Sequence, residues 1–211
     1  MADFEYFVVF AEMRTGSNFL ETNLNAFDGI DCYGEAFNPN FLGYPKTDEI
    51  LGISQETRDA NPQTLLRQIK HQPSGIGGFR YFHDHDPRVL DQCLTDPKCA
   101  KIILIRNPID SYVSWKIAQE TGQWKLTDAK SRKDGKATFD DVEFASHLEV
   151  QQSFQMTLLK ALQTSGQTAF YISYEDLQSV EVMNGLARYL GSDSELESLD
   201  KSLKKQNPSP I

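Results

Sequence analysis

The feature that most constrains the fold is the segment Lys101–Ile105 (KIILI), in which apolar side chains follow one another without alternation. A half-exposed strand alternates apolar and polar residues, whereas a strand of a parallel sheet with helices on both faces is apolar throughout. A second such run, Phe7–Phe10 (FVVF), lies near the start of the chain. The two runs together predict a parallel sheet that is covered on both faces.

The other segments alternate between strand and helix signals along the chain. Strands are expected within 29–39, over 76–82 and over 169–174, and helices after residue 18, after Pro62, after Pro87, over 109–119, over 139–162 and over 182–190. We expect residues 40–60 to form loops with short helical pieces, and residues 192–206 to form a charged helix. This order predicts a doubly wound α/β fold with ligands at the carboxyl ends of its strands. The whole chain, 1–211, is expected to be one domain with a polar mobile loop at about 121–138.

Composition narrows the classes of function that need considering. The formal net charge of −9 argues against general nucleic-acid binding and against an anionic membrane surface. No apolar run approaches the roughly 20 residues of a spanning helix, and the N-terminus lacks a signal-peptide pattern. The three cysteines, Cys32, Cys93 and Cys99, form no CxxC pair, so neither a disulfide framework nor a zinc site is indicated. We therefore expect a cytoplasmic protein with no integral membrane segment and no nucleic-acid partner.

A polar turn, Arg14–Asn18 (RTGSN), follows the first apolar run and precedes a helical pattern. A strand, a glycine-containing turn and a helix N-terminus gather backbone N–H groups around one point, where the helix dipole favours an anion. Ser17 and Asn18 add hydroxyl and amide donors, and Arg14 adds a fixed positive charge. The turn predicts a phosphate or sulfate site, although an ordinary strand-to-helix connection remains the simpler alternative.

A second arginine turn follows the run Lys101–Ile105. Here Arg106 ends the strand, and Ser111 and Ser114 lie in the helix that follows. Two anion sites at neighbouring strand ends suit a ligand with two separated phosphates, although Arg106 could instead pair with Asp110 at the helix start. The motif G-x-x-x-x-G-K-[ST] is absent, which argues against ordinary kinase or GTPase chemistry.

Several motifs, taken in order, resemble those of sulfotransferases that use 3′-phosphoadenosine 5′-phosphosulfate (PAPS). The matching segments are RTGSNF at 14–19, GEAFNP at 34–39, GFR at 78–80, RNPIDSYVS at 106–114, QETGQW at 119–124 and YEDL at 174–177. The finer match is to the bacterial carbohydrate branch, which includes the trehalose and Nod-factor sulfotransferases. This resemblance covers nearly the whole chain and implies a P-loop-like fold. It also implies an enzyme that moves a sulfuryl group from PAPS to a hydroxyl of a carbohydrate, glycolipid or similar small acceptor.

The resemblance assigns the donor to the two arginine turns. The residues that it implies in donor binding are Arg14, Thr15, Gly16, Ser17, Asn18, Phe19, Arg106 and Ser114. Residues 15–18 would cradle the 5′-phosphosulfate, Arg106 and Ser114 would hold the 3′-phosphate, and Phe19 would pack near the nucleotide. Many relatives have a lysine at the position of Arg14. A guanidinium does not easily give up a proton, so we expect Arg14 to stabilise the leaving phosphate electrostatically. No metal is implied.

The resemblance also implies a general base, Glu35 in GEAFNP, which would take the proton of the acceptor hydroxyl. Burial would raise its pKa toward neutrality, as suits a base, whereas the simpler alternative is a solvated loop acid. His83 and His85 are the reserve candidates for the base. The alternation of His83-Asp84-His85-Asp86 would suit a metal, but no further Cys/His cluster completes a site.

Other readings of the sequence remain open. The chain could be an ATP-dependent P-loop-type phosphotransferase or a nucleotide-binding module without catalysis. Trp124 could be an acceptor platform or an anchor to the core, and residues 174–177 are expected to be architectural. The resemblance implies a small-molecule or glycan acceptor, and related sugar enzymes can form homodimers. Relatives also continue past the position of residues 207–211, so a C-terminal extension is expected to be absent here.

Overall fold

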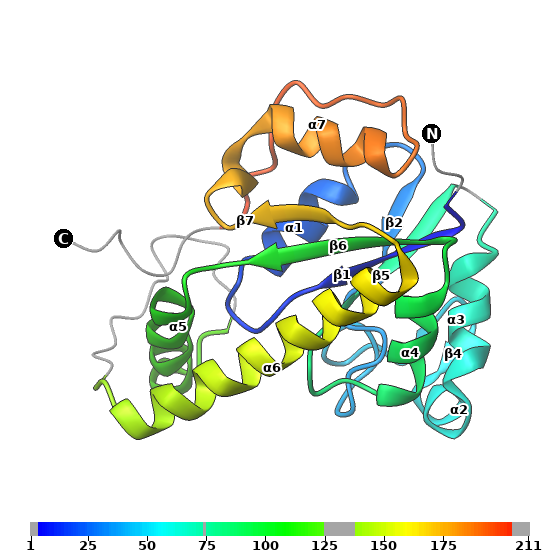
Figure 1. Ribbon diagram of the computed structural model, residues 1–211. Coiled ribbons are helices and arrows are strands. Elements are labelled where there is room, and N and C mark those ends of the chain that lie inside the picture. The colour runs from blue at the N-terminus through cyan, green and yellow to red at the C-terminus, as the bar shows by residue number, and fades with distance from the viewer. Residues whose placement is uncertain (1–3, 74, 125–137, 204–211) are drawn as a thin grey trace.

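The computed structural model describes residues 4–73, 75–124 and 138–203 of the chain. A five-stranded sheet with the order β2-β5-β1-β6-β7 forms its centre, and every neighbouring pair is parallel (Figure 1). Its strands are β1 (Tyr6–Phe10), β2 (Ile30–Cys32), β5 (Ile76–Tyr81), β6 (Cys99–Ile105) and β7 (Phe170–Ser173). The predicted doubly wound parallel sheet is therefore confirmed.

Helices cover both faces of this sheet (Figure 1). They are α1 (Ser17–Leu24), α2 (Gln55–Ala60), α3 (Pro62–Lys70), α4 (Pro87–Thr95), α5 (Pro108–Thr121), α6 (Asp141–Ser165) and α7 (Val180–Tyr189). Alternate side chains of β1 point to opposite faces. Val8 packs in one core with α3, α4 and α6, whereas Val9 packs in a second core with α1 and α7. Burial on both sides explains why β1 and β6 carry almost no polar residues.

Three of the helices begin with an N-cap side chain followed by proline, as the sequence predicts for α3. Asn61, Asp86 and Asn107 each accept a hydrogen bond from a backbone N–H in the first turn of their helix. Proline at N1 has no N–H to satisfy and already has a helical φ. These caps place the starts of α4 and α5 directly after the carboxyl ends of β5 and β6.

Residues 40–60 contain a small hairpin that the sequence analysis did not predict. Strands β3 (Glu49–Ile50) and β4 (Ile53–Ser54) pair antiparallel across Leu51 and Gly52, whose φ values of 50° and 75° are left-handed. Strands of two residues are too short to show an alternating pattern. The predicted short helical piece is present as α2, which Ser54 caps by accepting from Thr57 N–H.

The helix expected over 192–206 is wrong for the residues that the structure describes, because 192–203 contain no helix. Side chains from two helices instead bond to the backbone of this segment. Asn184 accepts from Leu196 N–H and donates to its carbonyl, and Asn23 does the same with Asp200. These long-range bonds, together with the buried side chain of Leu199, hold the segment against α1 and α7 without helical hydrogen bonds.

Two expectations fall largely on residues outside the described part of the chain. The loop predicted at about 121–138 includes 125–137, and the expectation about a C-terminal extension concerns the end of the chain after residue 203. Helix α5 ends at Thr121, with Gly122 in the left-handed conformation. Within 4–73, 75–124 and 138–203, no helix is long and apolar enough to cross a membrane.

Candidate functional site

The first arginine turn joins β1 to α1 through an unusual backbone. Arg14 and Gly16 both have left-handed φ values, 67° and 94°. A Cβ on Gly16 would lie 2.7 Å from Leu177 Cδ1 and 2.8 Å from Tyr174 Cδ2. Only glycine therefore fits. The YEDL segment packs directly against the turn, which agrees with the architectural role expected for it.

The hydrogen-bond donors of this turn form two groups: those of Thr15, which bond within the turn, and the backbone N–H groups that begin α1. Thr15 directs both its N–H and its hydroxyl at the carbonyl oxygen of Glu12, at 3.3 and 2.6 Å. In this structure Thr15 therefore shapes the turn. Gly16 provides no side-chain cap for α1, and the first N–H groups of a helix have no intrahelical acceptor. These N–H groups, at the positive end of the helix dipole, are suited to an anion.

The two arginine turns meet, because β1 and β6 are neighbours in the sheet. Arg14 Nε donates to Ser114 Oγ at 3.0 Å, and Arg106 Nη1 donates to the carbonyl of Arg14 at 2.7 Å. The guanidinium of Arg106 also lies 4.0 Å from the ring centroid of Tyr174. Arg14 thus contacts residues 92 and 100 positions later in the chain. Together with Tyr174 these residues form one cluster, which we call the arginine cluster: Arg14, Arg106, Ser114 and Tyr174.

The arginine cluster brings two guanidinium groups of like charge close together. Burial, reinforced by the charge of Arg106, lowers the pKa of Arg14 to about 10, while Tyr174 acts in the opposite direction. Within the described part of the chain, Arg106 makes no ion pair with Asp110, and its Nε is buried without a hydrogen-bond partner. An anion beside these guanidinium groups would relieve their repulsion and supply the missing acceptor.

Glu35 lies in the loop after β2 and is largely removed from solvent, with 16% of its side chain exposed. Its Oε2 accepts from Asn38 Nδ2 at 2.8 Å and lies 3.4 Å from His85 Nε2, and Oε1 lies 3.4 Å from Arg80 Nη2. A solvated loop acid is therefore the wrong description of Glu35. Burial raises the pKa of this carboxyl, but the His85 hydrogen bond, the charge of Arg80 and the Asn38 hydrogen bond outweigh burial and lower it. The expected upward shift is wrong in sign.

The two reserve histidines have different surroundings. His85 is buried, and its Nδ1 accepts from Phe82 N–H at 3.3 Å, so the ring proton lies on Nε2 and points at Glu35. This tautomer directs the Nε2 proton of His85 toward the carboxylate, at a distance of 3.4 Å that is long for a hydrogen bond. His83 is one-third exposed, and its Nδ1 lies 2.7 Å from Glu12 Oε2. That hydrogen bond raises the pKa of His83. Among the described residues, no group of three or more His, Cys, Asp or Glu side chains could hold a metal.

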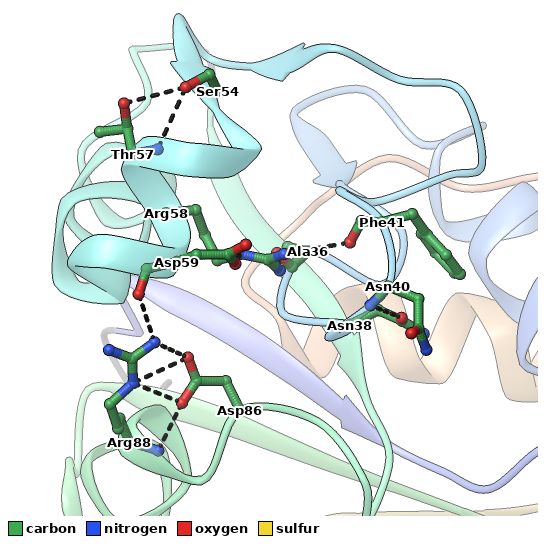
Figure 2. Close-up of polar contacts among 10 residues, drawn as sticks. All are labelled: Ala36, Asn38, Asn40, Phe41, Ser54, Thr57, Arg58, Asp59, Asp86 and Arg88. Carbon is green, nitrogen blue, oxygen red and sulfur yellow. Dashed lines mark hydrogen bonds and ion pairs between the residues drawn. The ribbon is translucent and has the colours of Figure 1, made fainter.

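The loop that follows Glu35 is fixed by a buried arginine that the sequence analysis did not single out. Arg58, from α2, is 1% exposed; it donates to the carbonyl of Ala36 at 2.8 Å and to that of Phe41 at 3.4 Å (Figure 2). It also pairs with Asp59, whose carbonyl accepts from Arg88 (Figure 2). No motif marks Arg58, because its partners are backbone carbonyls about 20 residues away.

A cleft of about 310 Å³ adjoins this loop. Its lining residues are Phe37, Pro39, Arg58, Asp59, Asp84, His85, Asp86, Pro87 and Arg88. His85 both lines the cleft and contacts Glu35, so the cleft lies beside the candidate base. The mixture of apolar, carboxylate and guanidinium groups is of the kind that binds a polar small molecule.

Two aromatic residues of the predicted site have distinct positions. The carbonyl of Trp124 accepts from Arg14 Nη1 at 2.7 Å, which ties this backbone to the arginine cluster, while its side chain is 48% exposed. Trp124 is therefore not an anchor buried in the core. Phe19 is partly buried and packs against the core between the sheet, α1 and α7.

Comparison with known proteins agrees with this fold. No family model matches the chain. Nodulation protein H of Rhizobium tropici is 27% identical over 123 residues, which are 57% of this chain and 49% of that protein. The chain thus spans about half the length of this curated relative.

Comparison with solved structures shows which class of fold the chain has. The crystal structure of a sulfotransferase from Alicyclobacillus acidocaldarius matches with a TM-score of 0.54 and 14% identity, over 96% of this chain and 86% of that one. A mouse sulfotransferase complexed with PAP (3′-phosphoadenosine 5′-phosphate) matches with a TM-score of 0.48 and 15% identity. This match covers 90% of this chain and 60% of the mouse chain. The match to the Alicyclobacillus structure gives the chain a sulfotransferase fold. This fold, with the sequence relative, confirms the predicted resemblance to bacterial sulfotransferases.

Proposed function

We propose that the chain is a PAPS-dependent sulfotransferase that acts on a hydroxyl of a carbohydrate, glycolipid or similar acceptor. The observation that carries the proposal is the arginine cluster, in which Arg14 and Arg106 lie side by side at the carboxyl edge of the sheet. A donor with a 5′-phosphosulfate and a 3′-phosphate supplies anions to both arginine turns. The similarity to nodulation protein H and to a sulfotransferase fold supports the same donor.

The donor residues divide along the two turns. Backbone N–H groups of residues 16–18, with the Ser17 and Asn18 side chains, would hold the 5′-phosphosulfate at the start of α1. Arg106 and Ser114 would hold the 3′-phosphate. Arg14 contacts Ser114 in this structure, so its guanidinium lies between the two turns, and its charge would reach the leaving phosphate without giving up a proton.

Glu35 is the proposed base. Its lowered pKa keeps the carboxylate ionised at neutral pH, so it is ready to accept a proton, although it is a weaker base than burial alone would make it. The acceptor hydroxyl would transfer its proton to this carboxylate while its oxygen forms a bond to sulfur. The bond between sulfur and the bridging oxygen would break, and its electron pair would leave with the 5′-phosphate.

The acceptor would lie between Glu35 and the neighbouring cleft. A sugar offers hydroxyls to the Asp84 and Arg88 side chains that line this cleft, and the exposed indole of Trp124 offers a flat apolar surface for a sugar ring. We also expect a cytoplasmic location and a homodimer; size-exclusion chromatography with light scattering tests the dimer.

The proposal is tested by incubating the protein with PAPS and a panel of glycans and detecting the added sulfuryl mass by mass spectrometry. Thermal shift with PAP against ATP–Mg²⁺ is measured in parallel. Sulfated product and stabilisation by PAP alone would support the proposal. Stabilisation by ATP–Mg²⁺ in place of PAP would favour a phosphotransferase, and binding of PAP without transfer to any acceptor would favour a non-catalytic module.

A further inference from the structure

Arg80 links the two halves of the proposed site. It lies in β5, is 2% exposed, and belongs to the GFR segment, for which the sequence assigned no role. Its Nε lies 2.7 Å from Glu21 Oε2, its Nη1 donates to Ser17 Oγ at 3.1 Å, and its Nη2 lies 3.4 Å from Glu35 Oε1. One buried guanidinium therefore contacts the phosphosulfate turn, the candidate base and a second carboxylate.

We propose that Arg80 is a positioning residue that holds Glu35 and the Ser17 hydroxyl in a fixed mutual geometry. This inference rests on the proposed function, in which Ser17 faces the donor and Glu35 the acceptor. A guanidinium is planar and carries its N–H groups in a rigid fork, so groups bound to different nitrogens cannot shift independently. An ammonium group on a flexible stem would not impose that constraint.

The contact with Ser17 also orients its hydroxyl. A serine hydroxyl has one donor hydrogen and accepts through its lone pairs. Because Arg80 donates to Ser17 Oγ, the serine proton points away from Arg80 and is available to a negatively charged ligand. Arg80 thus prepares a donor of the phosphosulfate turn before the ligand arrives.

Because Glu21 also pairs with Arg80, Arg80 can contact Glu35 without forming a close ion pair with it. The contact of Arg80 with Glu21 is shorter than its contact with Glu35, and the hydroxyl of Tyr44 donates to Glu21 as well. Glu21 is therefore the nearer of the two carboxylates beside this arginine. The groups facing Glu35 are then Arg80 from β5, His85 after β5 and Asn38 from its own loop, with Glu21 of α1 behind Arg80.

The test compares Arg80→Lys with Arg58→Lys in the full chain. Both replace an almost fully buried arginine by the same residue. Among the described residues, however, the hydrogen bonds and the ion pair of Arg58 are with the carbonyls of Ala36 and Phe41 and with Asp59, not with Glu35 or the donor turn. We expect Arg80→Lys to lower kcat for sulfuryl transfer by about tenfold or more, as for loss of a charge-assisted hydrogen bond. The KM for PAPS should change by less than about threefold, because backbone donors remain. Arg58→Lys alters the lining of the neighbouring cleft, so it should act mainly on the KM for the acceptor and lower kcat less than Arg80→Lys does.

A second readout does not depend on activity. The titration of the Glu35 carboxyl is followed by NMR of ¹³C-labelled protein, and its signal is assigned with Glu35→Gln. In Arg80→Lys this titration should move to higher pH, because the lysine ammonium stays with Glu21 and no longer contacts Glu35. Arg58→Lys should leave it unchanged. If the wild-type chain transfers no sulfuryl group but the titration moves, the proposed function fails and the coupling stands. An unchanged titration together with an unchanged kcat in Arg80→Lys overturns the inference.

A double variant covers the case in which Arg80→Lys does not fold. Glu21→Gln with Arg80→Met removes the buried cation together with its closest carboxylate, so no charge is left without its partner. We expect this variant to fold, to bind PAP and to show the same loss in kcat and the same upward movement of the Glu35 titration. Wild-type values for both would overturn the inference.

Discussion

Two glutamate–histidine pairs lie near the carboxyl end of β5, and they have opposite arrangements. In the pair Glu12–His83, the carboxylate side chain is 10% exposed and the imidazole 33% exposed. In the pair Glu35–His85, the imidazole is fully buried and the carboxylate is 16% exposed. Each pair thus presents one partner outward and uses the other to hold it in place.

Because the two pairs expose different groups, they offer different candidates for the base that takes the proton of the sugar hydroxyl. His83 presents an imidazole whose other nitrogen is occupied by Glu12, an arrangement that would suit a base on its own. Glu35 presents a carboxylate that is held by His85, Asn38 and Arg80, and Arg80 also contacts Ser17 of the phosphosulfate turn. Both pairs contact the donor turn, but in different ways. The backbone carbonyl of Glu12 accepts from Thr15, whereas the side-chain carboxylate of Glu35 is joined through Arg80 to the Ser17 hydroxyl that is proposed to face the donor. We therefore favour Glu35 over His83 as the proposed proton acceptor.

The largest effect is expected from Glu35→Gln. This change removes the proton acceptor but keeps the shape of the side chain, so turnover should fall by about 10²- to 10⁴-fold while PAP still binds. Steady-state kinetics and calorimetry measure the two quantities. The matched control is Glu12→Gln, which should lower turnover only a few-fold. An equal or larger loss in the control would reverse the assignment of the two pairs.

An intermediate effect is expected from His85→Asn. Loss of the imidazole N–H removes a group that lowers the pKa of Glu35, so this pKa should rise. Because the base must be ionised, the acidic limb of kcat/KM should move to higher pH, and turnover at neutral pH should fall by about tenfold. A pH–rate profile measures both. An acidic limb that stays in place in a correctly folded variant would show that His85 does not act on Glu35.

The smallest effect is expected from His83→Asn. Turnover should change by less than about threefold, since this residue only borders the site. The pKa of His83 is raised in the folded chain, so its pair with Glu12 contributes stability that is full below the unfolded pKa of about 6.5 and is lost as pH rises through the folded pKa. The variant should therefore lose about 2 °C in Tm at pH 5.5 and less at pH 8.5. A larger loss at pH 8.5 would contradict this sign.

The sequence predicted those parts of the molecule whose signals lie within a few neighbouring residues. Apolar runs marked β1 and β6, and the pair Asn61–Pro62 marked the start of α3, because each signal lies within a few residues. The two arginine turns were predicted for the same reason. Their contact follows from the sheet order, which places β1 beside β6.

Features that depend on distant partners were not predictable in this way. The sign of the pKa shift at Glu35 depends on Arg80 and His85, which lie 45 and 50 residues later in the chain. Arg58 lies in no motif, and the GFR motif assigned no role to Arg80, because the roles of both come from burial against groups on other elements. The segment after α7 resembles a charged helix locally, but side chains of Asn23 and Asn184 bind its backbone.

The central claim is that the arginine cluster forms a site for two phosphates, and calorimetry of nucleotide binding tests it most directly. PAP and adenosine 5′-phosphate, which lacks the 3′-phosphate, are titrated into the wild-type chain and into Arg106→Ala. We expect the wild type to bind PAP more tightly by about 10- to 100-fold, as for a charge-assisted contact, and Arg106→Ala to lose that preference. Equal binding of the two nucleotides by the wild type, or an unchanged preference in Arg106→Ala, would contradict the claim.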